Sequence, residues 1–162
     1  MNSEKSFVRS LGYLASTGTA KGIGVFASQA IAAEEVVEVA PVLQIRSAFE
    51  LIHAELQRRV FDWERIACVK GTSALGLGYA SMYNHANPAN MRYESALGSN
   101  AIMFIAVRYI EKDEELTINY NGREPLSTED IWFKMCDVVP VKEVDQNVQN
   151  GYYGGGLIWP EE

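Results

Sequence analysis

The chain is poor in the residues that build metal centres, disulfide frameworks and membrane spans. It holds two cysteines, Cys68 and Cys136, and two histidines in 162 residues, so a four-cysteine zinc site is excluded. The longest apolar run, residues 101–107, is far shorter than the ~20 residues that cross a bilayer. The first residues lack the basic-then-apolar pattern of a secretion signal. We therefore expect a soluble, cytoplasmic protein with no bound metal and no membrane partner.

Positive charge is also scarce. Lysine and arginine number 14 against 21 acidic residues, a net charge of −7. Nucleic-acid-binding domains usually carry a basic face, so no direct nucleic-acid partner is expected. A negative surface can attract a basic partner such as a lysine-rich tail. It can equally serve only to keep the protein soluble, and composition does not separate these two interpretations.

The pattern of apolar residues predicts one mainly β domain with short helices and small sheets. Strands are predicted over residues 23–27, 36–39, 42–45, 101–109 and 116–120, with a break at Pro41. Residues 30–35 are predicted to form a turn and residues 71–78 a loop. Residues 47–66 are predicted to form one helix, capped by Ser47 and Glu50. Its apolar stripe consists of Phe49, Ile52, Leu56, Val60 and Trp63. A second helix is predicted to begin at Ser127.

Three short motifs carry the chemical information. Lys21 precedes Gly22-x-Gly24, which leads into a strand-like segment rather than a helix, so a Rossmann dinucleotide loop is excluded. Asn84-His85 forms the second motif, and Glu-Leu-Thr-Ile-Asn-Tyr, ending at Tyr120, forms the third. Each motif alone is weak, because a Gly-x-Gly is usually a turn, a lone histidine is usually structural, and a tyrosine at a strand end usually packs.

Together and in this order, the three motifs resemble the SET domain, a family of S-adenosylmethionine-dependent protein-lysine methyltransferases. The resemblance covers residues 21–122, with flanks at 1–20 and 123–162, and is closest to the small SET proteins of the bacterial or viral type. It implies the SET (β-clip) fold of several small sheets, with a C-terminal strand threaded through a loop as a pseudoknot. The predicted helical segment, about residues 47–66 and extending to about 70 with its connection, would be an insert in that fold.

The resemblance also implies roles for individual residues. Tyr120 would be the catalytic tyrosine, orienting the reacting groups. Tyr93, eight residues after His85, would line the lysine channel with it, although an ordinary strand tyrosine is equally compatible. Asn84 and His85 would bind the adenine through their main chains, and the Asn84 side chain would hold the amino-acid end of the cofactor. The residues implied to bind S-adenosylmethionine are Lys21, Gly22, Ile23, Gly24, Asn84, His85 and Tyr120.

The sequence departs from the family pattern at several places. Ala86 replaces a serine, and Pro88 stands one place early relative to Asn90. Asn119 replaces an aspartate, and Asn121 separates the tyrosine from the following glycine. Ile118 stands where other members carry an aromatic residue that limits methylation, and the zinc cysteines that often follow the core are missing. Either Ile131, Trp132 and Phe133, or Tyr152, Tyr153 and Trp159, would then close the site by packing.

The implied function is methylation of a lysine on a basic protein, such as a histone-like, nucleoid or ribosomal protein. The departures leave one alternative open, a catalytically weak or inactive SET-like module that binds a peptide or the cofactor. A homodimer is compatible with either function.

Overall fold

The computed structural model describes residues 7–122 and Pro125. The predicted helix at Ser127, the C-terminal aromatic residues and Cys136 lie outside the described residues. Within them, no helix is long and apolar enough to cross a membrane.

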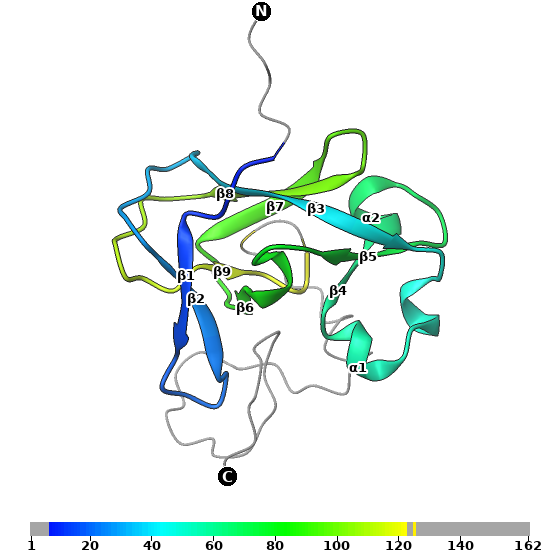
Figure 1. Cartoon of the computed structure of the whole chain (residues 1–162), viewed down its shortest axis with the longest axis horizontal. Coiled ribbons are helices and arrows are strands. Elements are labelled where there is room, and N and C mark those ends of the chain that lie inside the picture. The colour runs from blue at the N-terminus through cyan, green and yellow to red at the C-terminus, as the bar shows by residue number, and fades with distance from the viewer. Residues whose placement is uncertain (1–6, 123–124, 126–162) are drawn as a thin grey trace, which may run out of the picture.

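Three small sheets form the described part of the chain, in which helices are short (Figure 1). An antiparallel hairpin pairs β1 (Gly12–Ser16) with β2 (Ile23–Ala27). A five-stranded sheet has the order β4-β5-β3-β8-β7. Its strands are β3 (Val36–Ile45), β4 (Val60–Asp62), β5 (Ser73–Gly76), β7 (Met91–Ala96) and β8 (Ala101–Ala106). A parallel pair joins β6 (Asn84–His85) to β9 (Thr117–Ile118). The predicted mainly β fold with short helices is thus confirmed.

Strand β3 is continuous through Pro41, so the predicted break there is wrong. Its first half, up to Pro41, pairs with β8, and its second half, from Val42, pairs with β5. Proline lacks the N–H that a strand needs in mid-sheet, but here it lies where the strand changes partner. Its carbonyl accepts a hydrogen bond from Leu77 N at 2.9 Å.

The predicted single helix over residues 47–66 is also wrong. The segment contains a 3-10 turn η1 (Phe49–Leu51), a helix α1 (Ala54–Gln57), strand β4 and a helix α2 (Trp63–Ala67). Ser47 caps no helix, whereas His53 caps α1 and Asp62 caps α2 through their side chains. Pairing of β4 with β5 interrupts the helical pattern, and the same pairing makes residues 73–76 a strand within the predicted loop.

The core lies between the sheets and is rich in aromatic residues. Trp63, Tyr83 and Phe104 are among the largest fully buried side chains. The rings of Tyr83 and Phe104 lie 4.7 Å apart between centroids. Tyr83 precedes β6 directly, so this packing anchors the start of the parallel β6–β9 pair, which lies near the centre of the molecule in Figure 1.

Candidate active site

The Gly-x-Gly motif forms the end of the turn between β1 and β2. The Gly22 carbonyl accepts hydrogen bonds from both the backbone N and the Oγ1 of Thr17, each at 2.8 Å. Gly22 has φ +76°, a backbone conformation that favours glycine. At Gly24, an added Cβ would lie 2.6 Å from Glu115 Oε1 and 3.0 Å from Asn84 Nδ2. The second glycine is therefore needed for two side chains of the protein to approach the strand.

Asn84 joins this loop to the segment that precedes β9. Its side chain is fully buried, and Nδ2 donates to the Ile23 carbonyl at 3.2 Å and to Glu115 Oε1 at 2.8 Å. Because both partners are acceptors, the orientation of the amide is fixed. Its buried Oδ1 has no hydrogen-bond partner among the described residues.

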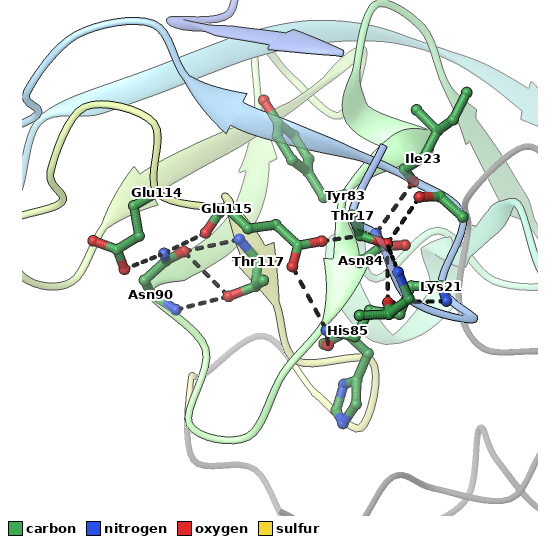
Figure 2. Close-up of polar contacts among 12 residues, drawn as sticks. Thr17, Lys21, Ile23, Tyr83, Asn84, His85, Asn90, Glu114, Glu115 and Thr117 are labelled. Carbon is green, nitrogen blue, oxygen red and sulfur yellow. Dashed lines mark hydrogen bonds and ion pairs between the residues drawn. The ribbon is translucent and has the colours of Figure 1, made fainter. Parts of the chain in front are cut away.

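Lys21 places a positive charge at the same point. Its Nζ lies 3.7 Å from Glu115 Oε2 and donates to the His85 carbonyl at 3.3 Å. Figure 2 shows Lys21, Asn84 and Glu115 gathered at the loop. Glu115 was recognised in the sequence only as the first residue of its motif, and its contact with both other motifs depends on the fold.

The parallel β6–β9 pair brings the second and third motifs together. Asn84 pairs with Thr117 and His85 with Ile118, and Ala86 N donates to the Ile118 carbonyl at 3.1 Å. Pairing of these strands fits the implied pseudoknot, while the threading of the chain through a loop stays a prediction.

His85 supports the backbone of Tyr120. Its Nδ1 accepts a hydrogen bond from Tyr120 N at 3.0 Å, so the ring proton of the neutral imidazole is on Nε2. Burial, and then the charge of Lys21, lower the pKa of His85 to about 4, although a hydrogen bond with the Ile118 backbone acts in the opposite direction. His85 is therefore uncharged at neutral pH, and its side chain acts here as an acceptor.

The two predicted site tyrosines each donate a hydrogen bond to a backbone carbonyl. The Tyr120 hydroxyl donates to the Tyr83 carbonyl at 2.8 Å. The buried Tyr93 hydroxyl donates to the Asn119 carbonyl at 3.3 Å, and its ring stacks edge-on against Phe61 with centroids 5.6 Å apart. Their catalytic and channel-lining roles stay predictions.

Two of the departures from the family pattern have structural explanations. Asn119 Oδ1 accepts from Asn121 N at 2.9 Å, while its Nδ2 donates to the Pro125 carbonyl at 3.2 Å. A deprotonated aspartate could not make the second bond. The shifted proline-asparagine pair is held by Asn90, whose Oδ1 accepts from Thr117 N at 2.8 Å and whose Nδ2 donates to the Glu115 carbonyl at 2.7 Å.

Asn90 thus fixes the loop after His85 to the third motif, on the side of Glu114 and Thr117 in Figure 2. Among the described residues, no group of three or more histidine, cysteine, aspartate or glutamate side chains could hold a metal ion.

The fold and this arrangement place the chain in a known family. Residues 22–121 match the SET domain, and the chain belongs to the SET domain family. A Schizosaccharomyces pombe histone-lysine N-methyltransferase, described as specific for H3 lysine-37, is 30% identical over 117 residues. The match covers 70% of this chain and 71% of that protein.

Solved structures of other proteins are similar in fold to this chain. The crystal structure of a Plasmodium falciparum candidate histone methyltransferase is 26% identical with a TM-score of 0.55, covering 70% of this chain and 95% of that one. A humanised Polycomb Repressive Complex 2 of Chaetomium thermophilum shows a likeness of fold at 21% identity and a TM-score of 0.58, over 73% of this chain and 16% of that one. The family and these relatives support the enzyme class predicted from the sequence, a protein-lysine methyltransferase.

Proposed function

We propose that the protein transfers a methyl group from S-adenosylmethionine to a lysine side chain of a basic protein. The observation that carries this proposal is the meeting of all three motifs. Asn84 links the Lys21–Gly24 loop to Glu115, while His85 and Tyr83 hold the backbone and hydroxyl of Tyr120.

The residues present fit the proposed cofactor. A buried acceptor without a partner costs free energy, and Asn84 Oδ1 is such an acceptor in the part of the chain that the structure describes. It suits the ammonium of the cofactor's amino-acid end. The nearby Lys21 side chain, 27% exposed, supplies positive charge suited to the carboxylate of the same group. Bound there, the cofactor would supply an electrophilic methyl group on a sulfonium.

The protein's own residues would orient rather than exchange protons. The Tyr120 hydroxyl donates its proton to the Tyr83 carbonyl, which fixes the position of the phenol oxygen. A free lysine has a pKa of about 10.4, and a channel with little water favours its neutral, nucleophilic form. Alignment of reactants contributes roughly 7–11 kcal/mol in well-oriented systems.

The substrate class follows from charge and from the relatives. The net charge of −7 suits a basic partner, and the Schizosaccharomyces pombe relative is described as acting on a histone lysine. A lysine-rich histone-like tail is therefore the substrate class that we propose, with nucleoid and ribosomal proteins as further candidates.

The test is incubation with labelled S-adenosylmethionine and a basic protein extract. Wild type and the control variant Tyr109→Phe, which alters an exposed tyrosine, should label lysine. Tyr120→Phe should lose nearly all turnover yet still bind the cofactor, because only the hydroxyl on the Tyr83 carbonyl is removed. Wild-type activity in Tyr120→Phe would refute the catalytic assignment. Cofactor binding by wild type without any transfer would instead favour the binding-module function.

A further inference from the structure

Strand β3 buries a carboxylate that the proposed reaction does not use. Glu38 is 4% exposed and lies between Val37 and Val39, both buried. In the part of the chain that the structure describes, no cation pairs with it. Burial of an unpaired carboxylate is costly unless hydrogen bonds satisfy it, so the contacts of Glu38 indicate what it does.

A bulge in β3 directs this side chain inward. The register with β8 shifts between Val36 and Glu38, so that Val36 faces Ile105 while Glu38 faces the next residue, Phe104. Glu38 is one of four consecutive buried residues, 37–40, in the half of β3 that pairs with β8. Bulges often re-aim a side chain beside an active site, and this bulge turns Glu38 toward the segment that leads into β6.

The carboxylate holds both ends of one short turn. Glu38 Oε1 accepts from Tyr79 N at 3.1 Å, and Oε2 accepts from the Tyr83 hydroxyl at 2.7 Å. Between these residues lies the 3-10 turn η2 (Ala80–Met82). The approach is so close that a Cβ at Gly78 would overlap Oε1.

A chain of hydrogen bonds from the N-terminal side completes the arrangement. Because the Tyr83 hydroxyl donates to Glu38, the Ser10 hydroxyl is the donor in its 2.9 Å contact with Tyr83. Gly12 N in turn donates to Ser10 Oγ at 3.2 Å. Consecutive hydrogen bonds of this kind polarise and strengthen one another. Burial, with the neighbouring Glu38, raises the pKa of Tyr83 well above its ordinary value, so this hydroxyl stays a donor.

The turn held by Glu38 ends at Tyr83, whose carbonyl contacts the proposed catalytic residue, Tyr120. The Tyr83 carbonyl accepts the Tyr120 hydroxyl at 2.8 Å. We propose that Glu38 is a positioning residue: by fixing the turn from Tyr79 to Tyr83, it sets the place of the Tyr120 hydroxyl. This role rests on the proposed function, since it matters for turnover only if Tyr120 orients the reacting groups.

The test compares kcat and cofactor affinity in purified full-length variants. Glu38→Leu removes both acceptors, and Tyr83→Phe removes the hydroxyl while keeping the ring. We expect each to lower kcat by about 100-fold, the scale for a misplacement of about 1 Å, with the cofactor Kd changed by less than about twofold. Their double variant should lose no more than the worse single variant, because both break the same link.

Two further variants separate positioning from general loss of structure. Glu38→Gln keeps one acceptor for Tyr79 N, and its amide can donate to the Tyr83 hydroxyl, so it should recover most of the lost kcat. Ser73→Ala removes a partly buried hydrogen bond to the Ser47 carbonyl, which is not among the contacts of the proposed site, and should leave kcat unchanged.

The outcomes divide clearly. Wild-type kcat in a folded Glu38→Leu or Tyr83→Phe protein would overturn the role of Glu38. Parallel losses of kcat and cofactor affinity would also overturn it, since they would mark a structural role alone. If Glu38→Leu does not fold, Tyr83→Phe decides by the same criteria. An inactive wild type would overturn the proposed function instead, and with it the positioning role of Glu38.

Discussion

The free energy of unfolding should fall in mildly acidic solution, because His85 takes up a proton more readily in the unfolded chain than in the folded one. Its Nδ1 accepts the hydrogen bond from Tyr120 N at 3.0 Å, so a proton on Nδ1 would set two N–H groups against each other. Burial, and then the charge of Lys21, lower the pKa of His85 to about 4 from its ordinary 6.5. The unfolded chain therefore takes up this proton at higher pH than the folded chain does.

The sign and size of the effect follow from these values. Between pH 6.5 and about 4 the unfolded state binds more protons, so stability falls as the pH falls through that window. With 1.36 kcal/mol for each pH unit between the two pKa values, the loss from pH 7.5 to pH 5 is about 2 kcal/mol. Burial raises the pKa of Glu38. Protonation of Glu38 therefore stabilises the folded protein as the pH falls, and this partly masks the loss of stability from His85.

A matched variant isolates the histidine. Urea unfolding of wild type and of His85→Gln, measured at several pH values, should differ in slope by the amount given above, because the contribution of Glu38 cancels in the comparison. His53→Gln, at an exposed position, removes the other histidine and so identifies its ring signal. The protein has two histidines, so proton NMR with these variants assigns both ring signals. An unchanged slope in His85→Gln, or an NMR midpoint for His85 near 6.5, would refute the reasoning.

The other predictions concern the Lys21–Gly24 loop and the predicted lysine channel. Gly24→Ala should weaken cofactor binding and cost about 1–3 kcal/mol in urea unfolding, because its Cβ meets Glu115 Oε1 and Asn84 Nδ2; unchanged binding in calorimetry would contradict this. Glu115→Gln should weaken cofactor binding less than Gly24→Ala, since it keeps an acceptor for Asn84 but loses the ion pair; a larger loss would count against the steric argument. Tyr93→Phe removes the hydrogen bond from the Tyr93 hydroxyl to the Asn119 carbonyl and should shift the products toward more methyl groups per lysine, read by mass spectrometry. An unchanged product distribution would favour a packing role.

Local patterns in the sequence predicted the motifs and part of the strands, but they missed β1, β4, β5 and β7 and all of the long-range pairings. Residues 23–27 and the start of β8 form strands as expected, because apolar patterning determines them locally. The prediction of one helix over residues 47–66 was wrong because residues 60–62 pair with β5 as strand β4, and this pairing interrupts the helical pattern. Pro41 is tolerated because β3 changes partner there, and the partner of a strand is not readable from its own residues.

The site shows the same division. The three motifs identified residues that lie together in the folded chain. The sequence did not show that Glu115 contacts both other motifs, through Asn84 and Lys21. Nor did it single out Glu38, although an acid between valines was a visible signal. Its meaning depends on a bulge and on Tyr83, 45 positions away, and only the folded chain brings these together.

The parallel β6–β9 pair has a consequence for the order of folding. It joins residues that are 33 positions apart through two residue pairs, and closing a loop of that size costs about 3 kcal/mol in chain entropy before any contact forms. Two residue pairs are too few to offset this entropy cost alone. We therefore expect β6 and β9 to pair only after the five-stranded sheet has brought them close. The proposed cofactor site would then be among the last parts to form and the first to open. Amide hydrogen exchange at residues 84–86 and 117–120 should therefore report local opening at a lower free energy than in β3 and β8.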